Sequence, residues 1–139
     1  MDYKKLYVGM ALTEAPEEFR GAFQAEIKKG LSTLEVEILD FIGLENGTEV
    51  DVYNHDRTCT ERADLCVFIV DHPSIGLGME IAFREVSNQP YMVFAKEGKR
   101  VTRMLTGMLK KKVLPLHRYH EVDDIVAAVE LQLKRLNEV

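Results

Sequence analysis

At 139 residues, with 46% hydrophobic and 29% charged residues, the chain is long enough to bury a substantial core, and we expect residues 1–139 to form a single domain. The net charge of −5 argues against a nucleic-acid polymer as partner, because the chain lacks a general basic field that could release counterions. No apolar run approaches the roughly 20 residues that span a bilayer, and the N-terminus lacks the apolar run of a signal peptide. We therefore expect a cytoplasmic protein that does not associate with membranes.

Short apolar segments alternate with amphipathic ones along the chain. The apolar runs predict strands at residues 4–9, 36–41, 65–70, 91–95 and 113–116, and Pro115 suggests that the last strand lies at a sheet edge. Helical periodicity predicts helices at 16–31, with Thr13 as N-cap, and at 52–63, 76–86, 101–108 and 122–136. The alternation predicts the α/β class: a doubly wound, flavodoxin-like or Rossmann-like parallel sheet of five strands with helices on both faces.

Polar residues and glycines follow the third predicted strand. The buried run Leu65–Val70 leads into the elbow Asp71–Ser74, then into Gly76 and Gly78, and then into a helix with Glu80 in its expected first turn. A strand, a glycine-rich elbow and a helix N-terminus form the usual anion site of an open α/β sheet. A carboxylate there would compete with a bound anion for the positive end of the helix. We therefore interpret Glu80 as a group that acts on a carbon near a phosphate, which makes the site catalytic.

Each candidate also has an ordinary structural explanation. Glu80 could be a surface carboxylate that complements the helix dipole, and Ser74 could be a turn or cap residue. Asp56 could be a solvated helix residue or a partner of Arg57 or Arg62. The two glycines alone are a weak signal, because G-x-G is common by chance.

Neither the cysteines nor the histidines have the spacing of a metal site. Cys59 and Cys66 fall in a predicted helix and strand, and we expect both to be buried free thiols. His55 and His72 lie near the predicted ligand edge, where they are either polar loop residues or donors to a phosphate or a base. Neither a Walker A sequence nor a G-x-S-x-G elbow is present. We expect no metal and no organic cofactor.

Four segments between Leu6 and Gly107 resemble the nucleoside 2-deoxyribosyltransferase superfamily, and within it most closely the 2'-deoxynucleoside 5'-monophosphate N-glycosidases. Two of these segments, VYNHDRTCTERADLCVFIV and HPSIGLGMEIAFR, contain the motifs that distinguish this family from other α/β proteins. The family has Y-x-x-D before an A-D-x-x-V strand, followed by P-S-x-G-x-G-x-E, and here these are Tyr53–Asp56, Ala63–Asp64 and Pro73–Glu80. Asp56 and Glu80 are 24 residues apart, which matches the family spacing.

The resemblance implies roles for individual residues. Glu80 would attack the anomeric carbon of a deoxyribose, and water would then resolve the glycosyl–enzyme. Asp56 would orient Glu80 or the sugar and handle the proton on the leaving base, while Tyr7 would hydrogen-bond the nucleophile. The predicted substrate-binding residues are Gly9 at the end of the first strand, Ser74, Gly76 and Gly78 around the 5'-phosphate, Arg100 from its charge alone, and Thr102.

Thr102 matches a position from which the family reaches the phosphate of a neighbouring subunit, so the resemblance also implies a homodimer or a higher homo-oligomer. The chain departs from the family after the first strand, where the hydrolases commonly have a serine, an arginine and glycines. This chain has Met10–Glu14 there, and the acidic Glu14 in place of an arginine weakens the phosphate site. Free deoxynucleosides or a modified nucleotide therefore remain alternative substrates.

The first functional hypothesis is an N-glycosidase that hydrolyses deoxynucleoside 5'-monophosphates. The alternative enzyme is a transferase that moves deoxyribose between bases, and water access to the glycosyl–enzyme distinguishes the two. A non-catalytic nucleotide sensor belongs to a different class. The pair Asp56 and Glu80 argues against a sensor, because a sensor needs no nucleophile and would gain by losing the repulsion between two buried anions.

Overall fold

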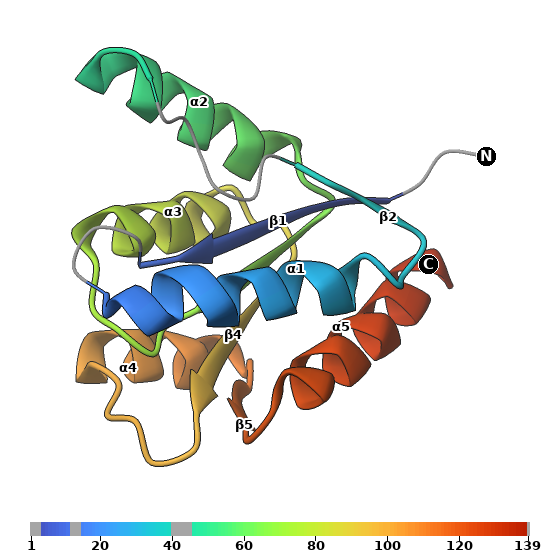
Figure 1. The fold of residues 1–139 in the computed structure, drawn as a ribbon. Helices are drawn as coiled ribbons and strands as arrows, with labels where there is room; N and C mark the ends of the chain where they lie inside the picture. The colour runs from blue at the N-terminus through green and yellow to red at the C-terminus, as the bar shows by residue number, and fades with distance from the viewer. Residues whose placement is uncertain (1–3, 12–14, 40–45, 139) are drawn as a thin grey trace.

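The computed structural model describes residues 4–11, 15–39 and 46–138. Figure 1 shows a twisted sheet with helices packed on its two faces. The strands of the described chain are β1 Lys4–Met10, β2 Val36–Ile38, β3 Leu65–Ile69, β4 Tyr91–Lys96 and β5 Leu116–Tyr119. The helices are α1 Gln24–Leu31, preceded directly by the π-helix η1 Phe19–Phe23, then α2 Glu49–Arg62, α3 Ile75–Val86, α4 Arg103–Lys112 and α5 Val122–Asn137.

The described strands form one parallel sheet in the order β2-β1-β3-β4-β5. This is the flavodoxin-like order, so the predicted doubly wound fold is confirmed. After β1 the chain moves to one side of the sheet, and after β2 it crosses to the other. Between the carboxyl ends of β1 and β3 the strand order therefore reverses, and open α/β sheets bind their ligands at such a point.

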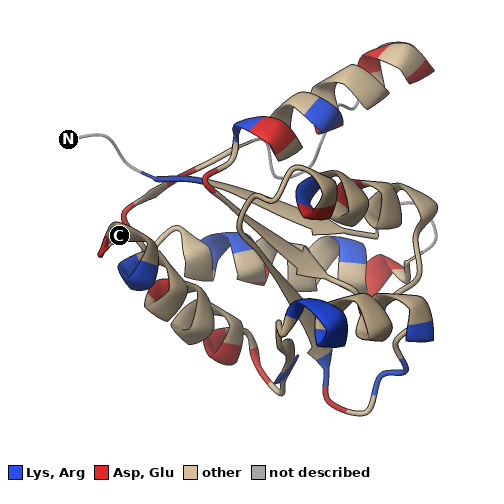
Figure 2. Cartoon of the chain, turned by 180° about the vertical axis from the view of Figure 1, so that it is seen from behind, with Lys and Arg blue, Asp and Glu red and all other residues tan. Residues whose placement is uncertain are grey.

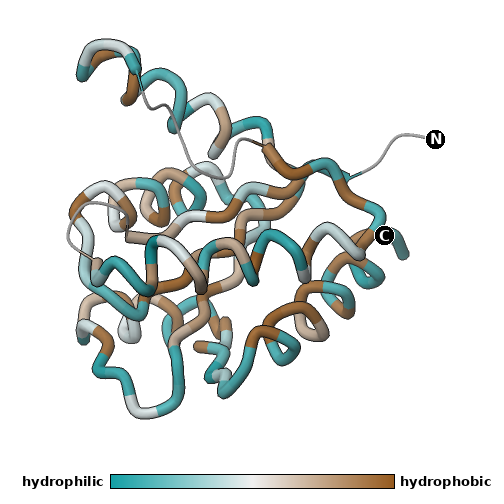
Figure 3. The backbone as a smooth tube through the Cα atoms, in the orientation of Figure 1, coloured by the Kyte–Doolittle hydropathy of each residue, from teal (hydrophilic) through white to brown (hydrophobic). Residues whose placement is uncertain are grey.

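Alternate residues of each strand face two different helical layers. One apolar cluster joins α1 and α5 to the sheet through residues such as Val8, Val67 and Phe94. The other joins α2 and α3 to the opposite face through Tyr7 and Phe68. Figure 3 shows the strands as a mainly hydrophobic centre, as expected for a parallel sheet that is buried on both faces. In the described part of the chain, no helix is long and apolar enough to cross a bilayer.

Two helix starts are fixed by capping side chains. The Thr48 hydroxyl accepts from the Asp51 amide, and the Asp51 carboxylate accepts from the Thr48 amide; this capping box begins α2 three residues earlier than predicted. Ser74 caps α3 in the same manner, with its hydroxyl accepting from the Leu77 amide at 3.3 Å. The cap predicted at Thr13 and the end of the second strand predicted near Phe41 lie outside the described residues.

The position of the last strand differs from the prediction. The segment 113–116 was expected to be a strand, but β5 starts only at Leu116, because α4 continues to Lys112. Val113 then adopts a left-handed conformation with φ of 58°, and the Leu114 amide donates to the Leu109 carbonyl. The predicted edge position of this strand is nevertheless confirmed by the strand order.

Candidate active site

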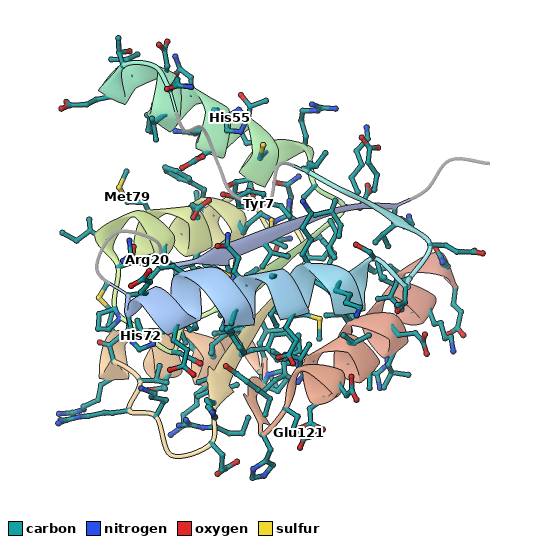
Figure 4. All side chains as sticks on the ribbon, viewed as in Figure 1. Tyr7, Arg20, His55, His72, Met79 and Glu121 are labelled. Carbon is teal, nitrogen blue, oxygen red and sulfur yellow. The ribbon has the colours of Figure 1, made fainter. Side chains whose placement is uncertain are left out.

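Three side chains from three different elements meet where the strand order reverses. The Tyr7 hydroxyl of β1 donates a short hydrogen bond to Oε2 of Glu80 on α3. The Thr60 hydroxyl of α2 lies 3.3 Å from the same oxygen. Figure 4 shows Tyr7 on the side of β1 that faces α2, which can be located in the picture by its label His55. Two hydroxyl groups thus converge on one carboxylate oxygen.

The surroundings of Glu80 raise its pKa from 4.5 to about 7. Burial is the main cause, and the negative charge of Asp56 adds to it, while the hydrogen bonds from Tyr7 and Thr60 oppose the shift. Burial and the adjacent carboxylate of Glu80 also raise the pKa of Tyr7, so its phenol stays protonated and remains a donor. Near neutral pH the site can therefore hold an ionised, partly desolvated carboxylate, which is the form a nucleophile requires.

The sequence pattern predicts Glu80 in the first turn of its helix, and this prediction is wrong. The helix begins at Ile75 behind the Ser74 cap, which places Glu80 in the second turn. The effect of the helix dipole is largely confined to the first turn. Complementing the dipole therefore does not explain this carboxylate, and the ordinary explanation for it is weakened.

The raised pKa of Glu80 predicts a pH-dependent gain in stability for Glu80→Gln. A carboxyl group with a folded pKa above its unfolded value contributes stability that is present below pH 4.5 and is lost as pH rises through about 7. We expect the free energy of unfolding of wild type, relative to Glu80→Gln, to fall by about 3 kcal/mol across this range. Urea unfolding at several pH values measures the difference. Parallel pH profiles for the two proteins would contradict the buried carboxylate.

Two residues that sequence reasoning missed support this site. Thr60 is fully buried on α2, and Arg84 is fully buried on α3 one turn after Glu80. The Arg84 guanidinium donates to the carbonyls of Thr60 at 2.9 Å and Ala63 at 2.8 Å, and also to those of Asp64 and Pro90. The spacing of both residues could have indicated their position. Thr60 follows Asp56 by four residues, and Arg84 follows Glu80 by four residues, so each shares a helix face with a predicted catalytic carboxylate.

Four of the six predicted binding residues line a cavity on the opposite flank of α3, and Gly9 and Gly76 do not line it. This cavity of about 360 Å³ between α3 and α4 is lined by Ser74, Gly78, Arg100 and Thr102, together with apolar side chains of both helices. Glu80 does not line it, because at 3.6 residues per turn Gly78 and Glu80 project in nearly opposite directions. The Glu80 contacts and the cavity therefore lie on two different flanks of α3.

The glycines differ in what the fold requires of them. A Cβ at Gly9 would lie 2.8 Å from Cδ1 of Phe68, so Gly9 is needed for packing. A Cβ at Gly78 would meet nothing within 4 Å, and one at Gly76 would meet only the Ser74 hydroxyl at 4.0 Å. Glycine inside a helix costs roughly 0.5–1 kcal/mol relative to alanine. Internal packing therefore does not explain Gly76 and Gly78, and close approach by a ligand would.

Lys and Arg residues are frequent in α4 and in the loop before it, as the blue segments in Figure 2 show. Residues 96–118 contain eight Lys or Arg residues and a single acidic one, Glu97, although the whole chain carries −5. The Arg118 guanidinium donates to the Lys99 carbonyl at 2.6 Å and so ties the loop before α4 to β5. The local charge of this region is thus opposite to that of the whole protein, and the region can attract a small anion to the loop that carries Arg100.

A buried carboxylate fixes the elbow between the two flanks. Asp71 accepts from the Lys96 amide at 2.8 Å and, through a short hydrogen bond, from the Tyr119 hydroxyl. These contacts tie the end of β3 to β4 and β5. His72 packs edge-on against the Phe19 ring, and burial lowers the pKa of this imidazole. The elbow that leads into α3 is thereby held by the sheet itself.

Cys59 and Cys66 are both buried and form no disulfide, in agreement with the prediction. Burial is the main cause that raises the pKa of Cys66, to about 12, which makes this thiol a poor nucleophile. Among the residues that the structure describes, no three His, Cys, Asp or Glu side chains are grouped as metal ligands. The described site offers the carboxyl group of Glu80, the nearby carboxyl group of Asp56, and the hydroxyl groups of Tyr7 and Thr60.

The parallel five-stranded sheet and its strand order correspond to the nucleoside deoxyribosyltransferase-like fold. The chain is similar in structure to the CMP N-glycosidase BcmB of Clostridium botulinum, with a TM-score of 0.71, 13% identity, and coverage of 93% of this chain and 99% of that one. It is 29% identical over 97 residues to the "Putative 2'-deoxynucleoside 5'-phosphate N-hydrolase 1" of Thermofilum pendens (strain DSM 2475 / Hrk 5), covering 68% of this chain and 67% of the relative. No family model matches the chain. The resemblance inferred from the sequence motifs is confirmed by these relatives.

Proposed function

We propose that this protein hydrolyses the N-glycosidic bond of a deoxynucleoside 5'-monophosphate, giving the free base and deoxyribose 5-phosphate. The observation that carries the proposal is the Glu80 carboxylate, which two hydroxyl groups hold by one oxygen and whose pKa is about 7. A relative named as an N-hydrolase of 2'-deoxynucleoside 5'-phosphates and a structural neighbour named as a CMP N-glycosidase support the same reaction class.

The proposed reaction has two steps. In the first, a Glu80 carboxylate oxygen attacks C1' of the sugar, the C1'–N bond breaks, and its electron pair leaves with the base, which takes up a proton through Asp56. In the second, water adds to C1' and loses a proton to Asp56, the glycosyl ester breaks, and Glu80 is regenerated. The negative charge of Asp56 raises the pKa of Glu80, so the two carboxyl groups interact electrostatically, which supports this role. Tyr7 donates to the nucleophile throughout.

The 5'-phosphate is proposed to lie at the N-terminal turn of α3. Backbone amides at a helix start and the positive end of its dipole favour an anion. Gly76 and Gly78 leave room for close approach, and Arg100 lines the same cavity as Ser74 and Gly78. The acidic Glu14, which weakens the expected phosphate site, lies outside the described residues. A 2'-hydroxyl would have to fit beside Glu80 and Tyr7, so we expect deoxyribose to be favoured.

Gly78→Ala should therefore make the protein more stable but a poorer enzyme. We expect the free energy of unfolding to rise by about 0.5–1 kcal/mol, since alanine is the better helix residue and its methyl group meets no protein atom. The same methyl group would crowd the phosphate and raise KM about fivefold or more, roughly 1 kcal/mol. Urea unfolding and steady-state kinetics measure the two effects.

Gly107→Ala is the matched control for that variant. Gly107 lies inside α4 and does not line the cavity, and a methyl group added there would meet nothing within 4 Å. The substitution should give the same gain in stability with an unchanged KM. An unchanged KM in Gly78→Ala would remove this turn from the phosphate site.

We also propose that a second copy of the chain covers the outer face of α3 and α4. Ile75 and Met104 are each 88% exposed, and Met79 is 44% exposed. Exposed large apolar side chains on these two helices suit a homodimer interface. Met104 and Thr102 both line the apolar cavity, and Thr102 could then reach the phosphate of the partner. Light scattering coupled to gel filtration should give twice the mass of the chain. A monomer at micromolar concentration would contradict this assembly.

The experiment that tests the function is base release from the four deoxynucleoside monophosphates and their ribonucleotide counterparts, followed by chromatography. Release of a free base from a deoxynucleotide supports the proposal. A second free base added to the assay separates hydrolysis from transfer, because a transferase would form a new nucleotide. Nucleotide binding without base release would favour the sensor and contradict the catalytic roles.

A further inference from the structure

Thr60 is held by two side chains of the neighbouring helix. Its hydroxyl lies 3.3 Å from Oε2 of Glu80, and its carbonyl accepts from Nη1 of Arg84 at 2.9 Å. Glu80 and Arg84 are one turn apart on α3. One face of that helix therefore contacts both the hydroxyl and the carbonyl of Thr60 on α2. Thr60 is fully buried, so water does not replace either hydrogen bond if it is lost, and the unpaired group destabilises the protein.

The Thr60 hydroxyl has one hydrogen and two possible acceptors. It lies 2.7 Å from the Asp56 carbonyl within its own helix and 3.3 Å from the Glu80 carboxylate. An ionised carboxylate is the stronger acceptor, and a protonated carboxyl group can instead donate to the hydroxyl oxygen. The hydroxyl can therefore follow the protonation state of Glu80 by rotating about one bond.

Both described donors to Glu80 reach the same oxygen. Tyr7 and Thr60 each contact Oε2, whereas Oε1 accepts no hydrogen bond from the described residues. A carboxylate held in this manner by one oxygen presents its other oxygen in a fixed direction. Fixed orientation of an attacking atom is a large source of rate enhancement, and small misplacements are costly.

We propose that Thr60 is a positioning residue that clamps Oε2 of Glu80, so that Oε1 is the oxygen that attacks the sugar. This inference rests on the proposed function and adds to it the identity of the attacking atom and the residue that selects it. Arg84 acts on Glu80 only through Thr60, because its guanidinium donates to the Thr60 carbonyl and holds that backbone against α3. The clamp favours the ionised form of Glu80, since a hydrogen bond to a carboxylate stabilises its charge.

The test compares Thr60→Val, which removes the hydroxyl at nearly constant shape, with Thr60→Ser, which restores it. The first readout is the titration of the Glu80 carboxyl carbon, followed by NMR in protein carrying ¹³C-labelled glutamate and assigned with Glu80→Gln. We expect the midpoint to rise by about 0.5 to 1 pH unit in Thr60→Val and to return in Thr60→Ser. The acid limb of the kcat/KM profile should shift by the same amount, with KM changed less than about twofold.

The other titratable groups that act on Glu80 or respond to its charge are the same in every variant. They are Tyr7 on β1, Asp56 on α2 and Cys66 on β3. Thr106→Val is the matched control, because the Thr106 hydroxyl also bonds to a carbonyl of its own helix, on α4, and does not contact Glu80. It should leave the titration unchanged.

An unchanged Glu80 midpoint in Thr60→Val, or a serine variant that folds but does not restore it, would overturn the inference. If valine is not tolerated, Thr60→Ala gives the same comparison. The titration needs no substrate, so it tests the clamp even if wild type releases no base. Absence of base release in wild type would instead count against the proposed function.

Discussion

Replacing Glu80 by alanine should reduce base release by at least about two orders of magnitude. The loss follows from the removal of the nucleophile, since a covalent route needs an atom that attacks C1' and no other described carboxylate is hydrogen-bonded by both Tyr7 and Thr60. Substrate affinity should change far less, because the proposed phosphate contacts are made by the N-terminal turn of α3. Single-turnover kinetics with saturating enzyme measures the chemical step separately from binding.

Glu85→Gln is the matched control for this experiment. Glu85 lies on the same helix as Glu80 but pairs with Lys112 at 2.9 Å, away from Tyr7 and Thr60. Its removal should leave base release within about twofold of wild type, since a partly exposed ion pair contributes little. Substantial activity in Glu80→Ala would show that another group attacks the sugar or that water attacks it directly.

Arg84→Met should destabilise the protein by about 3 kcal/mol or more. The guanidinium satisfies four backbone carbonyls at the end of α2, the start of β3 and the turn before β4. Methionine fills much of the volume but donates no hydrogen bond, and each buried polar group left unsatisfied costs about 1–3 kcal/mol. Urea unfolding gives the difference in the free energy of unfolding.

Arg62→Met provides the comparison for Arg84→Met. Arg62 is the exposed last residue of α2, close in sequence to the carbonyls that Arg84 holds. Its replacement should change stability by less than about 0.5 kcal/mol, as is usual for surface positions. Equal effects of the two substitutions would mean that the buried contacts of Arg84 contribute nothing specific.

The sheet could be predicted from sequence because the apolar runs and their spacing define it. The buried run at 65–70 and the helices on either side require a parallel crossover arrangement, and the structure has it. The last strand was misplaced because Val113 and Leu114 are apolar but serve to end α4, with their amides bonded back to that helix. An apolar run that closes a helix cannot be distinguished by composition from one that starts a strand.

The candidate site was predicted only in part, for a physical reason. Motif resemblance pointed to Tyr7, Asp56 and Glu80, and the structure brings the first and last of these into contact. The motif resemblance did not include Thr60 or Arg84. Their spacing of four residues from Asp56 and Glu80 places them on the same helix faces, but their contacts depend on how α2 packs against α3, which a single sequence does not give. Ser74 and Gly78, which were predicted to hold the phosphate, line a cavity on the flank of α3 that does not carry Glu80. The Ser74 cap sets where the helix begins and thereby which side chains share a flank.

The most direct test of the central claim is the mass of the intact protein during turnover. Wild type mixed with a cleaved deoxynucleotide and quenched in acid within milliseconds should carry the added mass of deoxyribose 5-phosphate, and peptide mapping should place it on Glu80. The adduct should be absent from Glu80→Ala. Rapid base release by wild type with Glu80 unmodified at every quench time would contradict the covalent route.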